Sequence, residues 1–105
     1  MSKIMVGGTE HDAVLTMGTL VRFRDKAGYD FLKEPGRMDA VGLAIMAWAG
    51  IATAAKRDGK EFDTSWEELA DSMTIPEVNA LQQWIERETS TGDSDDTGKK
   101  KAKSR

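Results

Sequence analysis

Residues 37–60 read RMDAVGLAIMAWAGIATAAKRDGK, and they form the only extended apolar stretch in a chain of 105 residues. Five of its apolar side chains recur every three to four positions, which is the spacing of one face of an α-helix: Met38, Val41, Ile45, Trp48 and Ala52. Other alanines and an isoleucine widen this stripe around most of the circumference, as is typical of a helix buried on several sides. The stretch therefore predicts a central helix over 38–57 with the other elements packed around it.

The ends of this predicted helix suit its dipole. Asp39 lies near the start, Lys56 and Arg57 lie in the last turn, and Gly59 follows as a C-cap glycine. Small residues inside the helix would let partner backbones come close: Ala40, Gly42, Ala44, Ala47, Ala49, Gly50 and Ala54. The uncharged part, 40–55, is shorter than the ~20 residues that a membrane span needs, so we expect no membrane insertion.

Charge and composition narrow the kinds of protein that the chain can be. The net charge is −3, but residues 1–92 carry 15 acidic and 10 basic groups (−5), while residues 93–105 carry three Asp, four Lys and one Arg (+2). An acidic body argues against specific nucleic-acid binding. The chain has no cysteine, which excludes a disulfide framework and a thiolate metal site. The N-terminus lacks a signal-peptide pattern, which predicts a cytoplasmic protein.

The N-terminal side of the chain predicts a hairpin and one helix. Residues 3–15 contain two short apolar runs, KIMV and AVLT, around the turn-rich GGTEHD, and this pattern predicts a β-hairpin. Thr16 is the expected N-cap of a helix over 17–27, and Gly28 is its expected left-handed end. Four residues of this helix are expected to face inward: Met17, Leu20, Val21 and Phe23.

Two further helices are predicted on the C-terminal side, over 64–73 and 76–88. Each is preceded by a capping box, in which a Thr side chain and a Glu side chain three residues later satisfy backbone N–H groups at the helix start. The two boxes are Thr64–Glu67 and Thr74–Glu77. Pro76 suits the first position of the last helix, where its missing N–H costs nothing.

The predicted fold is α+β and mostly α. We expect a single domain over 1–89, in which a short N-terminal β-hairpin is followed by about four helices packed around the central apolar helix. A folded part of about ninety residues can bury a modest core. Residues 90–105 contain no large apolar side chain, so they are predicted to form a disordered polar and basic tail.

No pattern in the sequence indicates catalysis, a cofactor or a metal. The only histidine, His11, lies in a predicted turn, where a solvated side chain is expected rather than a base that activates a nucleophile. Asp58, Glu61 and Asp63 lack the twelve-residue calcium loop and its closing glutamate. Gly7 and Gly8 lack the lysine and serine of a phosphate loop. We therefore expect a protein that is not an enzyme and that needs no cofactor.

Three tryptophans are many for this length, and two of them suggest a contact surface. Trp48 is expected in the core, whereas short helices cannot all hide an indole, and exposed tryptophans are enriched at protein contacts. The candidates for a partner-binding or self-association face are Trp66, Met73, Leu81 and Trp84. The terminal GKKKAKSR is consistent with a solubilising tail and also with an arm that holds nucleic acid weakly.

The order of these elements resembles the tail assembly chaperones of long-tailed (siphovirus-like) bacteriophages over most of residues 3–88. The hairpin is followed by TMGTLVRFRDKAGYDFL (16–32), a helix closed by glycine and an aromatic step. An alanine-rich helix with Trp-Ala-Gly, a charged loop and an acidic short helix follow in AIMAWAGIATAAKRDGKEFDTSWEELADSM (44–73). A last helix after Pro76 and a polar, lysine-ended tail complete the similarity.

The resemblance implies a non-enzymatic role. Proteins of this family bind the long helical tape measure protein and keep it from aggregating until tail-tube subunits polymerise around it. They act in the host cytoplasm and are absent from the mature virion. In many phages a ribosomal frameshift yields a longer form that recruits the tail-tube protein, and residues 98–100, Gly-Lys-Lys, are what a slippery codon run would encode. Self-association of the chain also fits this picture.

Two other functions compete with this interpretation. A small structural adaptor, such as a head-completion or tail-terminator protein, would remain in the virion. A small DNA-binding regulator would use the helices over 64–73 and 76–88 as a helix-turn-helix. The second of these helices offers Arg87 as its only basic residue beside Glu77, Glu86 and Glu88, so it would repel phosphate.

Overall fold

The structure is a computed structural model that describes residues 2–90 of the chain. A two-stranded hairpin precedes four α-helices, so the fold is α+β and mostly α, as predicted. The elements in order are β1 (Ser2–Val6), β2 (Thr9–Ala13), α1 (Met17–Ala27), the short 3₁₀ helix η1 (Pro35–Arg37), α2 (Ala40–Arg57), α3 (Trp66–Ser72) and α4 (Ile75–Ser90). The predicted tail began at residue 90, but Ser90 belongs to α4. The rest of that tail, 91–105, lies outside the described residues.

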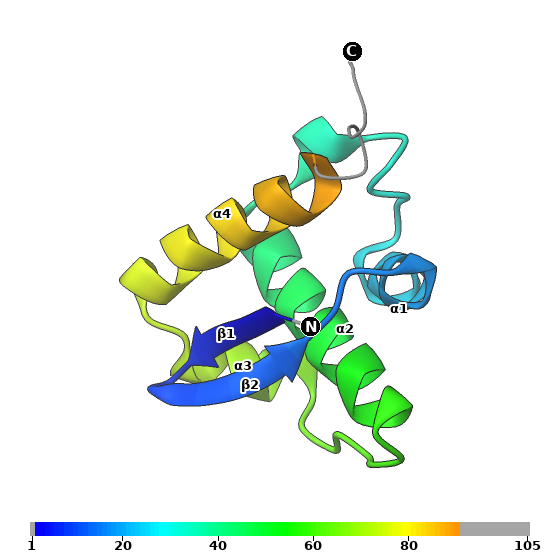
Figure 1. Ribbon diagram of the computed structural model, residues 1–105. Helices are drawn as coiled ribbons and strands as arrows, with labels where there is room; N and C mark the ends of the chain where they lie inside the picture. Colours follow the sequence, from blue (N-terminus) through cyan, green and yellow to red (C-terminus); the bar gives the residue numbers. More distant parts are fainter. Residues whose placement is uncertain (1, 91–105) are drawn as a thin grey trace.

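Helix α2 runs through the middle of the molecule (Figure 1). The hairpin and α4 lie on one side of it, α1 packs along a second side and α3 along a third. The prediction of a central helix is therefore confirmed, although α2 begins two residues later than expected. Its N-cap is Asp39, whose Oδ1 accepts the N–H of Gly42 at 2.8 Å. Gly59 ends it in the left-handed region (φ 74°) and donates its N–H to the carbonyl of Lys56.

The hairpin turns at Gly7 and Gly8, whose φ values of 60° and 80° are those of a type I′ turn. The strands are antiparallel, and Val6 pairs with Thr9 across the turn. This arrangement places Ile4 and Val6 on the buried face of the sheet. The predicted hairpin extended to residue 15, but β2 ends at residue 13 and the chain then crosses α2.

That crossing brings α2, α4 and the end of β2 into close contact in the core. The N–H of Val14 donates to the carbonyl of Gly50 in α2 at 3.2 Å. A Cβ added to Gly50 would lie 2.9 Å from the Cη2 atom of Trp84 and 3.2 Å from the carbonyl oxygen of Val14. The expectation that small residues let other backbones approach is therefore confirmed at this position, where α2, α4 and the end of β2 meet.

Helix α1 has the predicted ends but not the predicted face. Thr16 is its N-cap, and Gly28 ends it with φ 85°. Phe23 is fully buried, as expected, whereas Met17 and Val21 are 67% and 61% exposed. The prediction that Met17 and Val21 face inward is wrong because α1 turns the face containing Thr19 and Phe23 onto α2. At 100° per residue, the four residues predicted to face inward spread over roughly 160° of the helix circumference, so they cannot all face α2.

The caps of α3 and α4 explain where these helices begin. The box before α3 is Ser65–Glu68 rather than the predicted Thr64–Glu67, so α3 begins at residue 66 and ends at residue 72. Both pairs have the spacing of a capping box, but the carbonyl of Thr64 accepts the indole N–H of Trp48 at 3.0 Å. The hydrogen bond between Trp48 and Thr64 joins residues 16 positions apart, so the capping-box pattern in the sequence could not show that Ser65 rather than Thr64 is the N-cap.

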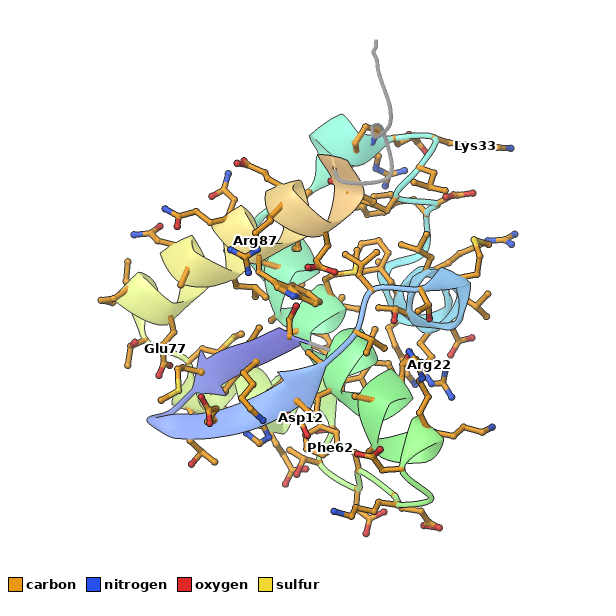
Figure 2. The ribbon with its side chains drawn as sticks, viewed as in Figure 1. Asp12, Arg22, Lys33, Phe62, Glu77 and Arg87 are labelled. Atoms are coloured by element: carbon orange, nitrogen blue, oxygen red, sulfur yellow. The ribbon has the colours of Figure 1, made fainter. Side chains whose placement is uncertain are left out.

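The predicted second box, Thr74–Glu77, is confirmed, but α4 begins one residue earlier than expected, at residue 75. The Glu77 carboxylate has a further role. Its Oε1 and Oε2 atoms accept the backbone N–H groups of Gly7 and Gly8 at 2.8 and 2.9 Å, which fastens the hairpin turn to the start of α4 (Figure 2). The backbone N–H of Thr74, together with those of Gly8 and Gly7, lowers the pKa of Glu77 from its ordinary value of 4.5.

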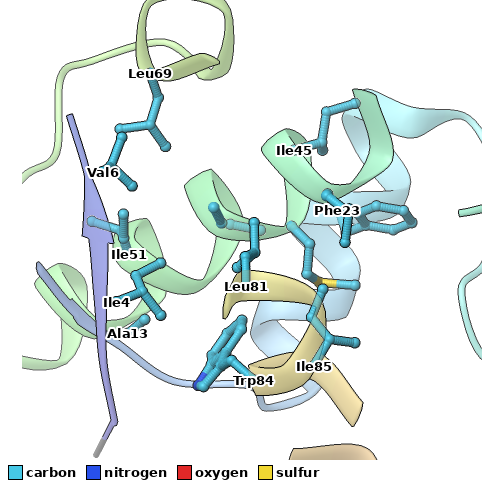
Figure 3. Close-up of a cluster of buried hydrophobic side chains, with 14 residues drawn as sticks. Ile4, Val6, Ala13, Phe23, Ile45, Ile51, Leu69, Leu81, Trp84 and Ile85 are labelled. Atoms are coloured by element: carbon cyan, nitrogen blue, oxygen red, sulfur yellow. The ribbon is translucent and has the colours of Figure 1, made fainter. Parts of the chain in front are cut away.

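The core contains Leu81 and Trp84 of α4, which point toward the hairpin and α2 (Figure 3). Only 3% of Leu81 and 1% of Trp84 are exposed. Glycine at position 50 leaves room for the indole against α2, so even a helix of this small protein hides a tryptophan completely. The indole Nε1 of Trp84 has no hydrogen-bond partner.

Candidate partner-binding groove

One side of α2 is left open, and it is the side that the sequence pattern placed in the core. Val41 is 53% exposed, while Trp48 and Ala52 are half-buried. These residues follow one line along the helix. Ile45 lies on the same line but is only 3% exposed, so the line is open at Val41, Trp48 and Ala52 and covered between Val41 and Trp48. The opposite side of α2 is buried along its length: Leu43, Met46, Ala47, Gly50 and Ala54. The predicted direction of the stripe is therefore wrong for Val41, because the hairpin and α4 cover the other side of the helix.

Three adjoining hollows follow this open line. They measure about 340, 260 and 430 Å³; the first two share Lys26 and Trp66, and the second and third share Trp48. Together they form a groove, hereafter the α2 groove. Its floor is the open side of α2, one wall is α1, and the other wall is the loop from residue 62 with the start of α3. Figure 2 labels one residue of each wall, Arg22 on α1 and Phe62 in the loop.

Trp48 lies in the middle of the groove floor and contacts both walls. Its indole N–H donates to the carbonyl of Thr64 in the loop wall at 3.0 Å. On the other side, the Nζ atom of Lys26 lies 5.8 Å from the centre of the indole ring, within the range of a cation–π contact. The ring is thus held in one orientation with its remaining surface in the groove.

The two walls carry opposite charge. Arg22 and Lys26 of α1 form the basic wall, where Asp25 offsets part of the charge from 3.9 Å away. Asp63 and Glu67 form the acidic wall. The basic wall is a local exception, since residues 1–92 as a whole carry five more acidic than basic groups, 15 against 10.

Of the four predicted contact residues, only Trp66 lines the α2 groove. Met73 is half-buried at the other end of α3 and packs against the core. The prediction that Leu81 and Trp84 form a partner face is wrong because both are buried in the core. The structure therefore does not bring the four together on one surface. Val21 and Val41 of the groove were missed because their spacing is that of core-facing residues.

A second apolar hollow of about 480 Å³ lies where η1 and the start of α2 face the end of α4. Phe31, Met38, Leu43 and Ile85 line it, and Glu86 lies at its edge. It is separate from the α2 groove, since the two share only Asp39 at the start of α2.

The structure places His11 in β2 rather than in a turn. It is half-buried, and its ring meets the Phe62 ring edge-on at 5.9 Å, so the prediction of a solvated turn histidine is wrong. Among residues 2–90 no three His, Cys, Asp or Glu side chains are grouped so that they could hold a metal ion. Within the same residues, no helix combines the length and apolar character needed to cross a bilayer.

The geometry defines a small α+β protein whose central helix is covered on three sides and grooved on the fourth. Comparisons with protein-family models, with curated proteins and with solved structures find no match for this chain.

Proposed function

We propose that the chain is a tail assembly chaperone of a long-tailed bacteriophage. In this role it binds the tape measure protein without covalent chemistry and keeps it in solution while tail-tube subunits polymerise. The order of hairpin, glycine-ended helix, alanine-rich helix, short acidic helix and last helix supports the proposal, because it is the order on which the resemblance rests.

The observation that carries the proposal is the open apolar floor of the α2 groove. A chaperone of this kind needs apolar surface that another chain can reach on a body that stays in solution. Val41 on the floor and Val21 on the α1 wall are more than half exposed, and Val21 lines the same hollow as Trp48. The outer surfaces of α3 and α4 carry acidic residues that would keep the complex soluble.

Co-expression with the tape measure protein tests this function. We expect the tape measure protein to remain in the supernatant with the chain and to pellet without it. The two should also elute together from a sizing column. If the tape measure protein pellets equally in both cases, the proposed function is wrong.

Localisation and the longer form belong to the same proposal. We expect the protein in the host cytoplasm and not in purified virions. Mass spectrometry of virions checks this, since a head-completion or tail-terminator protein would be found in them. Codons 96–101 should contain a run on which two tRNAs can re-pair in the −1 frame, giving a form that recruits the tail-tube protein. A gene without such a run would contradict this.

A further inference from the structure

The two walls of the α2 groove differ in charge, and this difference indicates what kind of segment binds there. In the middle hollow the Trp48 floor lies between Lys26 on one wall and Asp63 and Glu67 on the other. We propose that the groove binds one amphipathic helix of a partner protein. The apolar stripe of that helix lies on the floor, its acidic flank faces α1, and its basic flank faces the loop and α3. This proposal names the kind of client segment that the proposed chaperone would bind, so it rests on the proposed function.

The walls and floor favour a helix over an extended strand. The floor and one wall are helices, whose backbone N–H and C=O groups are bonded within the helix. An extended segment would find few backbone partners there, whereas a helix satisfies its own backbone groups. The part of α2 that lines the groove runs from Val41 to Trp48, about 10 Å at 1.5 Å per residue, which matches about two turns of a partner helix. Apolar anchors one turn apart are the usual means by which such a helix binds.

The charges of the walls also set the direction of the bound helix. Reversing a helix in a groove exchanges its two flanks, so a helix with one acidic and one basic flank meets opposite charges in one direction only. In the other direction like charges face each other, which opposes binding. The basic wall distinguishes this occupant from a second copy of the same acidic chain, because the outward charges of α3 and α4 are mainly acidic and neither helix has a basic flank.

Two labelled synthetic peptides of about 14 residues test the proposal with the full chain. The matched peptide has one leucine stripe, Glu along one flank and Lys along the other. The scrambled peptide has the same composition and leucine stripe, with Glu and Lys mixed on both flanks. Fluorescence anisotropy should show the matched peptide binding about threefold more tightly at about 0.05 M NaCl. The difference should vanish at about 0.5 M NaCl, where exposed charges are screened.

Variants then locate the site. Val41→Lys places a charge on the floor and should weaken binding of the matched peptide at least about fivefold. Leu32→Lys makes the same change at a residue that is 60% exposed outside the groove, and it should have less than about a twofold effect. Lys26→Glu should remove the preference for the matched peptide. Lys33→Glu, at an exposed residue that lines none of the three hollows, should retain it (Figure 2). Circular dichroism confirms that each variant is folded.

Three results would overturn the proposal. The first is equal weakening by Val41→Lys and Leu32→Lys. The second is equal binding of matched and scrambled peptides at low salt. The third is a free chain that sediments as a dimer and becomes monomeric in Val41→Lys, which would make a second copy the occupant.

The two proposals fail separately. If Val41→Lys keeps the tape measure protein as soluble as the unchanged chain does, the groove proposal fails and the proposed function stands. If the peptides bind as expected while the tape measure protein still aggregates, the groove proposal stands and the proposed function fails.

Discussion

Replacing Gly50 by alanine tests the close contact between α2, α4 and the end of β2. The new Cβ would lie 2.9 Å from Cη2 of Trp84 and 3.2 Å from the carbonyl oxygen of Val14. Neither neighbour can move easily, since Trp84 is 1% exposed and the carbonyl belongs to the backbone. Overpacking of this kind costs up to about 3 kcal/mol. Alanine stabilises a helix interior by about 1 kcal/mol relative to glycine, so the expected net loss is about 2 kcal/mol.

Thermal unfolding followed by circular dichroism measures this effect. A loss of about 2 kcal/mol lowers the melting temperature of a domain of this size by roughly 8–16 °C. Gly18→Ala in α1 is the matched control, because the nearest atom to its Cβ is the flexible end of Arg22 at 3.3 Å. This control should melt at or slightly above the temperature of the unchanged protein.

A second variant identifies the contact responsible. Trp84→Phe removes the Cη2 atom, so Gly50→Ala should cost less in that background than alone. The reasoning is refuted if Gly50→Ala melts at or above the temperature of the unchanged chain. Equal costs in the two backgrounds would show that the indole is not the obstacle.

Three further predictions concern the caps and the core. Glu77→Gln should destabilise the hairpin. Hydrogen bonds to the ionised carboxylate lower the pKa of Glu77 below 4.5, so this carboxylate stabilises the folded chain above pH 4.5 and the stabilisation is lost as the pH falls through the lowered pKa. Acid unfolding of the unchanged chain should therefore be steeper than that of Glu77→Gln. Asp39→Ala removes the N-cap of α2 and should cost about 1 kcal/mol in urea unfolding, whereas Asp39→Asn should cost little. Leu81→Ala should cost about 2–5 kcal/mol and Met73→Ala distinctly less; similar losses would contradict the assignment of Leu81 to the core.

The elements could be predicted from the sequence because their signals are local. Gly7 and Gly8, the caps at Thr16 and Asp39, and the apolar run of α2 each act within a few residues. The predicted boundaries of the described helices are therefore within about two residues of those observed, which is the usual uncertainty of helix ends. The α+β class follows from the same signals.

Which side of each helix is buried could not be predicted in the same way. Helix α2 is apolar almost all round, so its periodicity has little contrast and cannot show which line stays open. The burial of Trp84 depends on the missing side chain at Gly50, 34 positions away along the chain. The bond from Gly7 to Glu77 spans 70 residues. Contacts of this range exist only after folding, and so does the α2 groove.

The two sides of the central helix α2 have different surroundings: one side packs in the hydrophobic core, and the other side is the floor of the α2 groove. A segment that binds there therefore binds only the native chain, and its concentration must raise the melting temperature. At a hundred times its dissociation constant it would add about 2.7 kcal/mol, or more than about 10 °C for a domain of this size. Thermal-shift screening of a client's helices, one at a time, would thus rank them by affinity.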